Sequence, residues 1–264
     1  MSTTLQPDFQ YLQKTFTLDQ TDAMAQAVYD DGFALIPNVL SQSEIADLRA
    51  AVDRLTPFGF DSHNTNEHYK CVFNREKIFL DLVDRQGIIE LAESTMGPQC
   101  HIIGLTAWKS HPGHNGWSPH TDQLFITLPE EYASDPRVTL PVYICTAHYY
   151  LSDIPLELCP TYVIPGSHKS GRSPQKGEDT WHGNALEPVL CKAGDVLFFR
   201  SEVWHSGSQN QSDQTRYLVQ VHYSHRTVSQ RFSPFPFSYN QQLLAGANDR
   251  QLRLLGKHPE MAYG

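Results

Sequence analysis

Apolar residues recur at helical spacing in the first third of the chain. Over residues 45–55 they stand three or four positions apart, which is the spacing of one face of an α-helix. Ser41 and Glu44 precede this run in the order of a capping box, in which two side chains satisfy backbone N–H groups at the start of a helix. A second helical stretch runs from about residue 75 to 94. The pattern predicts a helical N-terminal part over residues 15–97.

The pattern changes near residue 100 to short apolar and aromatic runs separated by glycine and proline. Many short strands behind a helical layer are typical of a mainly β fold, the double-stranded β-helix (jelly roll or cupin-like), in which two antiparallel sheets face each other across a pocket. We therefore expect a single domain over 1–264, with the jelly roll over about 100–228 and a C-terminal cover over 229–264. The candidate strands are 100–108, 119–126, 142–151, 161–164, 196–200 and 216–224.

Composition and charge narrow the possible partners. The chain has 264 residues, 40% of them hydrophobic, which is enough for one domain with a substantial core. Its formal net charge of −9 argues against a nucleic-acid partner, because phosphate binding needs clustered Lys and Arg. No apolar run approaches the ~20 residues of a membrane span, and the N-terminus lacks the apolar segment of a secretory signal. The five cysteines form no Cys-x-x-Cys pair, which favours a reduced, cytoplasmic protein without a membrane partner.

The His120-Thr121-Asp122 segment is the strongest indication of chemistry. On a β-strand, residues two apart point to the same face, so His120 and Asp122 can bind one metal ion. With His205 they form the two-histidine, one-carboxylate set that holds Fe(II) and leaves one face of the metal open. A 2-oxo acid and dioxygen fill such open positions, so we expect Fe(II), 2-oxoglutarate and O2 as cofactors. A second His-x-Glu, at His258, contains a proline and has no later histidine to complete a triad.

Arg216 opens a strand with strict alternation, in which Arg216, Leu218, Gln220 and His222 share one face. A guanidinium inside the barrel can bind a carboxylate through two parallel hydrogen bonds. On an exposed edge strand, the same arginine would be only a solvated cation. Its position after His205 favours a role in binding the cosubstrate.

The chain resembles the phytanoyl-CoA dioxygenase (PhyH) family, and the resemblance covers most of the chain from about residue 25. It implies the double-stranded β-helix fold and dependence on Fe(II) and 2-oxoglutarate. It also implies that His120, Asp122 and His205 are the iron ligands and that Arg216 binds the C5 carboxylate of 2-oxoglutarate. The matching stretches are 109–122, 151–171 with its Pro-Gly-Ser-His-Lys-Ser-Gly segment, 193–199 and 204–216.

The chain departs from the family pattern at two places. The family often has Glu-Asn-Gly-Pro where this chain has Cys159 in place of the glycine, so the local backbone geometry is in question. Many relatives carry His-Gly-Ser at the second histidine, whereas this chain has His205-Ser206-Gly207, which leaves Ser208 or Ser206 as the hydroxyl that assists 2-oxoglutarate. The resemblance also bears on the reaction, because halogenating relatives have a small residue where Asp122 stands. A carboxylate there favours hydroxylation or a related oxidation over halogenation.

The remaining pocket residues are predicted from their places on strands and loops. His148 is expected beside 2-oxoglutarate, where it would supply a ring and a hydrogen bond, although an outward position on its strand is an equal alternative. Trp117 and Leu105 are expected to line the same pocket. No catalytic residue is expected beyond the metal centre. The candidate substrate-binding residues, all from the loop over 57–74, are His63, Tyr69 and Lys70.

Together these features predict an Fe(II)- and 2-oxoglutarate-dependent oxygenase. It would hydroxylate or otherwise oxidise a small-molecule metabolite of secondary metabolism and form succinate and CO2. One alternative is a cupin-type metal-dependent oxygenase that does not use 2-oxoglutarate, which would not need Arg216. Another is a non-catalytic jelly roll that binds a ligand.

Overall fold

The computed structural model describes residues 9–61, 64–133, 135, 137–230, 232 and 237–259. The α-helices are α1 (Thr21–Asp30), α2 (Gln42–Asp53), α3 (Lys77–Leu80), α4 (Ile88–Met96), α5 (Glu130–Ala133), α6 (Gln241–Ala245) and α7 (Asp249–Leu254). Two short 3-10 helices are η1 (Val72–Asn74) and η2 (Ser167–Ser170). The strands are β1 (Phe33–Ile36), β2 (Gly59–Phe60), β3 (Asn66–Tyr69), β4 (His101–Ser110), β5 (Ile144–Tyr150), β6 (Thr161–Val163), β7 (Thr180–Trp181), β8 (Asn184–Ala185), β9 (Glu187–Val189), β10 (Val196–Arg200), β11 (His205–Gly207) and β12 (Arg216–Ser224).

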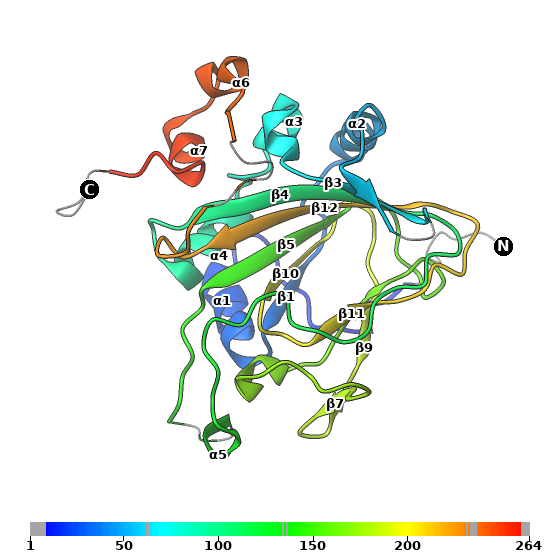
Figure 1. Cartoon of the computed structure of the whole chain (residues 1–264), viewed down its shortest axis with the longest axis vertical. Coiled ribbons are helices and arrows are strands. Elements are labelled where there is room, and N and C mark those ends of the chain that lie inside the picture. Colours follow the sequence, from blue (N-terminus) through cyan, green and yellow to red (C-terminus); the bar gives the residue numbers. More distant parts are fainter. Residues whose placement is uncertain are drawn as a thin grey trace.

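The major sheet has seven strands in the order β1-β10-β5-β12-β4-β3-β2. All of its pairings are antiparallel, and β12 lies between β4 and β5 over nearly its whole length. Figure 1 shows β4, β12 and β5 side by side across the middle of the molecule. Because β12 is central, its inward-facing side chains meet those of both neighbouring strands.

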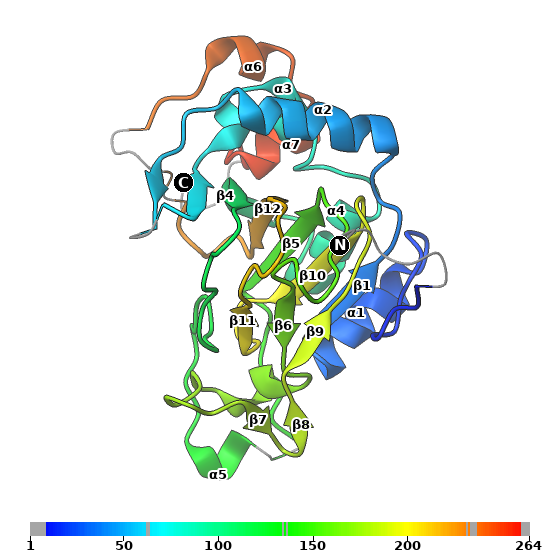
Figure 2. The ribbon, with the colours of Figure 1, turned by 90° about the vertical axis from the view of Figure 1, so that its right-hand side faces the viewer.

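The minor sheet has the order β11-β6-β9 and faces the major sheet (Figure 2). The segment around His120 extends this sheet by an antiparallel bridge to His205 on β11. Two facing antiparallel sheets with non-sequential strand order confirm the mainly β, double-stranded β-helix fold predicted from the sequence.

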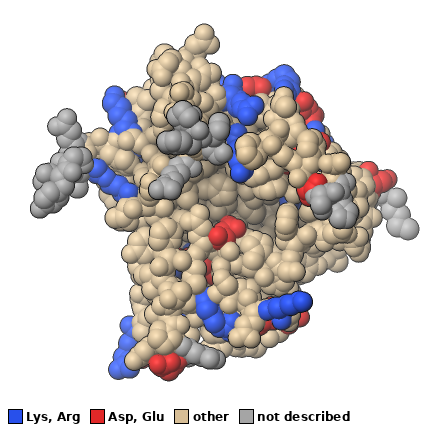
Figure 3. All heavy atoms as spheres, in the orientation of Figure 1, with Lys and Arg blue, Asp and Glu red and all other residues tan. Residues whose placement is uncertain are grey.

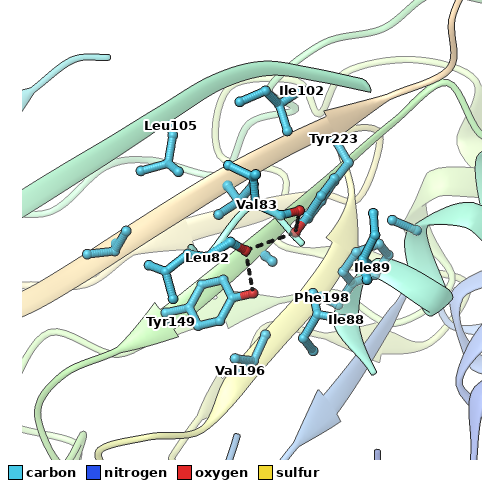
Figure 4. Close-up of a cluster of buried hydrophobic side chains, with 14 of the residues drawn as sticks. Leu82, Val83, Ile88, Ile89, Ile102, Leu105, Tyr149, Val196, Phe198 and Tyr223 are labelled. Atoms are coloured by element: carbon cyan, nitrogen blue, oxygen red, sulfur yellow. Dashed lines mark hydrogen bonds between the residues drawn. The ribbon is translucent and has the colours of Figure 1, made fainter. Parts of the chain in front are cut away.

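The helices α1 to α4 pack on the outer face of the major sheet. Alternation on β12 directs Val219, Val221 and Tyr223 into this helix-covered core, where all three are fully buried. Figure 4 shows how the core also satisfies its polar groups: the Tyr223 hydroxyl donates to the carbonyl of Val83 at 3.0 Å, close to that of Leu82. The opposite face of β12 is left free to line the space between the two sheets.

Local structure agrees with the sequence in some places and differs in others. The capping box at Ser41 and Glu44 is confirmed, since Ser41 Oγ accepts from Glu44 N and Glu44 accepts from Ser41 N. The helix expected over 75–94 is instead split into α3 and α4 by turns that end at Gly87, whose φ of +83° suits glycine. The strand expected over 119–126 is wrong apart from the single bridge at His120, because beyond it the segment makes an isolated backbone bond from Asp122 N to Ser201 O rather than a continuous ladder.

The C-terminal part contributes α6 and α7, which lie with α3 beyond the major sheet in Figure 1. Phe232, Phe237 and Tyr239 form an aromatic cluster with Phe73 of η1. His258, from the second His-x-Glu pattern, bonds to His101 at the start of β4, with 2.9 Å between ring nitrogens. Among the described residues, no helix is long and apolar enough to cross a membrane.

Candidate functional site

His120, Asp122 and His205 converge although they come from distant parts of the chain. One ligand atom from each lies within 4.8 Å of the others. Asp122 Oδ1 is 3.9 Å from His120 Nε2 and 3.6 Å from His205 Nε2. The backbone holds this arrangement: His120 and His205 exchange two N–H···O bonds of 2.9 and 3.0 Å, and Asp122 N donates to Ser201 O at 3.0 Å.

Hydrogen bonds from the far side of each ring fix the tautomer of both histidines. His120 Nδ1 lies 2.8 Å from Ser118 O, and His205 Nδ1 lies 3.0 Å from Val203 O. A carbonyl only accepts, so each Nδ1 carries the proton and each Nε2 presents a lone pair toward Asp122. Burial lowers the pKa of His205, which favours the neutral, ligating form. Two neutral imidazoles and a carboxylate on one side of a cavity fit a divalent iron ion.

The triad lines a cavity of about 410 Å³ between the two sheets. Inward-facing residues of β12 line it in the alternation that the sequence predicts. Asp122 and Arg216 are the only acidic or basic lining residues other than histidines among those that the structure describes. The lining residues are Asn66, His68, Thr106, Trp108, Ser110, His114, Trp117, His120, Asp122, His148, Thr161, His205, Ser206, Gly207, Ser208, Arg216, Leu218, Gln220 and His222.

Arg216 faces this cavity rather than solvent. Its Nη1 donates to Cys159 O at 2.6 Å, while its buried Nε has no hydrogen-bond partner among the described residues. A buried donor without a partner is costly, so this guanidinium is suited to receive an acidic ligand. Cys159 itself adopts a φ of +39°, so the chain keeps a left-handed backbone where relatives often have glycine. That conformation directs the carbonyl that orients Arg216.

His148 points into the cavity from β5, which settles the alternative that the sequence left open. Its Nε2 is 2.7 Å from Gln220 Nε2, and its buried Nδ1 has no partner among the described residues. Burial, with the neighbouring His205 and Arg216 adding, lowers its pKa well below the usual value, so the ring is neutral.

Trp117 and Ser208 lie at the cavity where the loop after β4 approaches β11. Trp117 N donates to Gly207 O at 2.7 Å, and the indole remains 56% exposed. Gly116 permits the close approach, because its φ is +75° and an added Cβ would lie 2.2 Å from Gly207 O. The Ser208 hydroxyl donates to Pro160 O at 3.0 Å, and Ser206 lines the cavity as well.

Other predicted pocket residues lie elsewhere. Leu105 does not line the triad cavity; it faces the helices, is fully buried in the core, and borders only the smaller adjoining cavity (Figure 4). Tyr69 is wrong as a substrate contact, because its side chain is buried on the same outer face and its hydroxyl donates to Glu67. Lys70 borders the adjoining cavity, with Nζ 4.3 Å from the Phe58 ring centre. His63 lies outside the described residues.

The sequence reasoning missed several residues on the major sheet. Thr106 and Trp108 line the cavity from β4, next to the misplaced Leu105, because helices cover the more apolar face of that strand. His68 lines it from β3, a strand in the segment expected to be a loop. His114 also borders the cavity, and His222 shares the face of Arg216. The alternation from Arg216 to His222 was the available signal for β12, but nothing comparable marks His68.

Comparison with known proteins gives similar sequences and similar folds. A dioxygenase of Aspergillus fumigatus, af480, is 26% identical over 231 residues, which cover 81% of this chain and 69% of that protein. The dioxygenase andF of Emericella variicolor is 29% identical over 108 residues, or 40% of this chain and 34% of its own length. Among solved structures, the non-haem α-ketoglutarate-dependent epimerase SnoN from nogalamycin biosynthesis has a TM-score of 0.64 at 21% identity, covering 83% of this chain and 88% of its own.

HygX from Streptomyces hygroscopicus, solved with nickel and 2-oxoglutarate, has a TM-score of 0.62 at 19% identity, covering 79% of this chain and 88% of its own. At these identities the solved structures support the fold. The sequence model of the phytanoyl-CoA dioxygenase family matches residues 28–218, a range that includes the triad and Arg216. The chain therefore belongs to the phytanoyl-CoA dioxygenase family, whose members use iron, 2-oxoglutarate and dioxygen.

Proposed function

We propose that this protein oxidises a small-molecule metabolite, with succinate and CO2 formed from 2-oxoglutarate. His120, Asp122 and His205 would bind the iron, and Arg216 would bind the C5 carboxylate. The observation that carries this proposal is the convergence of three ligand atoms within 4.8 Å, with both imidazoles held in the ligating tautomer. A structural histidine pair would not need both Nε2 atoms free.

Bound iron and 2-oxoglutarate would supply the oxidising chemistry. The chain's own residues would bind and orient the iron, the 2-oxoglutarate and the substrate. Arg216 has a buried Nε that lacks a partner and lies in the same cavity as the triad, as a carboxylate-binding residue requires. His148 and Ser208 line the same cavity and offer further hydrogen bonds. Trp117 covers the side of the cavity next to β11.

The outcome proposed is hydroxylation or a related oxidation rather than halogenation. Asp122 places its carboxylate between the two Nε2 atoms, where it can complete the ligand set. With that carboxylate in place, no ligand position is vacated for a halide. We expect a small-molecule substrate as its partner, and neither nucleic acid nor a membrane. We expect its location to be cytoplasmic.

The alternatives fit the site less well. A cupin-type oxygenase without 2-oxoglutarate would leave no reason for Arg216, a half-buried cation with a buried, unpartnered Nε among the described residues, to face the cavity. A non-catalytic binding jelly roll would not need three converging ligand atoms.

The test is a titration of the purified protein with Fe(II) and then 2-oxoglutarate under anaerobic conditions, followed by exposure to O2. We expect a visible charge-transfer absorption that needs both additions, then one succinate for each CO2 released. His205→Ala, which removes a ligand, should abolish both readouts; His225→Ala, which changes a histidine outside the cavity, should retain both. Tight iron binding without any response to 2-oxoglutarate would instead support a cupin-type oxygenase.

A further inference from the structure

We propose that the substrate is an uncharged molecule with a ring system and a hydroxyl or carbonyl group, and that His68 selects it as a neutral hydrogen-bonding partner. This inference rests on the proposed function, because it takes Asp122 and Arg216 to be occupied by iron and 2-oxoglutarate. It adds the substrate class and a specificity-determining residue.

The first argument is the distribution of charge. Apart from Asp122 and Arg216, every described residue that lines the triad cavity is uncharged or a histidine. Once these two side chains bind the metal and the cosubstrate, no formal charge remains for a substrate group. Burying an unpaired charge costs several kcal/mol, so a carboxylate or an ammonium would be disfavoured there. Figure 3 shows a hollow near the middle of one face that is bordered mostly by residues other than Lys, Arg, Asp and Glu.

The second argument is His68 itself. Its ring lies parallel to that of Trp108, with centroids 3.6 Å apart and an interplanar angle of 8°. Its Nε2 is buried and has no hydrogen-bond partner among the described residues. Burial, with Lys70 and His222 adding, lowers the pKa of His68 to about 4, so the ring is neutral near pH 7. A neutral imidazole nitrogen that lacks a partner is matched by a hydroxyl, and in the protonated Nε2 tautomer also by a carbonyl.

The third argument is the shape and character of the surroundings. A smaller cavity of about 330 Å³ adjoins the first and shares Thr106, Asp122 and His222 with it. Cavities of roughly 300–1,000 Å³ hold drug-sized ligands, so the pair has room for a body larger than 2-oxoglutarate. Large aromatic side chains are exposed nearby: Trp117, 56% exposed, lines the triad cavity, and Phe58, 55% exposed, lies under the ammonium of Lys70, which borders the smaller cavity. Exposed aromatic residues beside a cavity are typical of a binding surface for an apolar ring system.

Among the described residues that line the two cavities, Lys70 is the one lysine or arginine besides Arg216. It is therefore the cation that could attract an acidic substrate. It borders only the smaller cavity, and its ammonium lies over the Phe58 ring. A single lysine at the margin cannot replace the clustered cations that a coenzyme A phosphate group needs. The arrangement of these side chains therefore favours a neutral ligand. A substitution of Lys70 tests the alternative of an acidic ligand.

The test uses three compounds with one tricyclic skeleton: dehydroabietinol, dehydroabietic acid and dehydroabietylamine, which are neutral, anionic and cationic at pH 7. Each is titrated anaerobically into the protein loaded with Fe(II) and 2-oxoglutarate, and binding is read from the charge-transfer absorption and from tryptophan fluorescence. We expect the alcohol to bind at least about tenfold more tightly than the acid or the amine. Absence of saturable binding by the alcohol, or equal binding of either ion, overturns the proposal.

Variants of His68 test whether this residue selects the neutral substrate. His68→Phe keeps a ring against Trp108 but removes Nε2, and should weaken alcohol binding about five- to tenfold, while dehydroabietane, which lacks the hydroxyl, binds as before. His68→Gln retains a hydrogen-bonding group and should restore most of the affinity. An unchanged alcohol affinity in His68→Phe overturns the role of His68. Acid binding that is tight and lost in Lys70→Met overturns the neutral class.

A wrong substrate class can be distinguished from a wrong proposed function. If the charge-transfer absorption of the wild-type protein never forms, the proposed function is wrong. If it forms and the three compounds do not discriminate by charge, only the substrate class is wrong.

Discussion

Gln220 Nε2 lies 2.7 Å from His148 Nε2, and this contact determines which nitrogen of His148 carries the proton. The Gln220 amide is itself oriented, because its Oε1 accepts from Trp108 Nε1 at 2.8 Å and from Thr106 Oγ1 at 3.0 Å. Its nitrogen must therefore donate, so His148 Nε2 accepts and Nδ1 is protonated. The Nδ1–H is buried without a partner among the described residues, and we propose that it donates to the cosubstrate.

Replacing Gln220 should therefore weaken 2-oxoglutarate binding without removing any residue that touches the metal. In Gln220→Glu, a carboxylate accepts from His148 Nε2 and turns Nδ1 into an acceptor, which repels a cosubstrate carboxylate. We expect the KM for 2-oxoglutarate to rise about tenfold, in line with the loss of one hydrogen bond to a charged group. The imidazole ¹⁵N shifts of His148 should report the change of tautomer.

The control for Gln220→Glu is Thr106→Val, which removes only one of the two donors to Gln220 and should leave the tautomer and the KM close to wild type. A normal KM in Gln220→Glu with an altered tautomer would exclude His148 as a cosubstrate donor.

Arg216→Met should raise the Kd for 2-oxoglutarate about 10- to 100-fold, because a charge-assisted contact is lost. Arg216→Lys should recover only part of this, since an ammonium lacks the planar fork of a guanidinium. The kcat at saturating 2-oxoglutarate should fall much less than the affinity. Lys109→Met is the matched control, because Lys109 pairs with Asp53 and Glu67 outside the cavity. Equal Kd values in both variants would remove Arg216 from the cosubstrate site.

The sequence predicted those parts of the fold and site that depend on local periodicity. Alternation on β12 placed Arg216 and Gln220 on one face, and the structure has both in the cavity. The prediction that Leu105 lines the pocket from its strand was wrong, because helices cover one face of the major sheet, and that face is the more apolar of the two. His68 was not predicted, since its place depends on β3 pairing with β4 across a large sequence separation. Such pairings are invisible in one sequence, whereas spacing within a strand is not.

Metal binding should stabilise the fold through the triad. At about a hundred times its Kd, Mn(II) stabilises a folded protein by about 2.7 kcal/mol, which corresponds to an increase in Tm of about 5–10 °C for a chain of this size. His120→Ala and Asp122→Ala should lose this increase, as should the wild-type protein in excess chelator. His225→Ala should keep it. An increase in Tm that survives in both triad variants would place the metal elsewhere.

Asp195 should stabilise the fold, although it does not line the cavity that contains the triad. Its fully buried carboxylate accepts from Lys192 N at 2.7 Å, from Asn38 N at 3.0 Å and from the Tyr11 hydroxyl at 3.0 Å. Asp195→Ala leaves these donors without an acceptor and should lower the free energy of unfolding by about 3 kcal/mol. Asp213→Ala, at an exposed position, should change it by less than about 0.5 kcal/mol. Urea unfolding measures both, and a similar small effect for the two variants would contradict the assignment.

His168 should make the fold less stable in mild acid. Its Nε2 lies 3.0 Å from Tyr29 O, so Nε2 donates, and burial lowers the pKa of the ring to about 3. The unfolded chain has a histidine pKa near 6.5, so above that pH neither state binds the proton and the full stability is present. As the pH falls below about 6.5, only the unfolded state takes up the proton, and about 1.4 kcal/mol is lost per pH unit, or about 2 kcal/mol by pH 5. In His168→Gln, which keeps a donor for Tyr29, the slope of unfolding free energy against pH between 6 and 5 should be smaller by about one proton. An unchanged slope would show that His168 is already protonated in the folded protein.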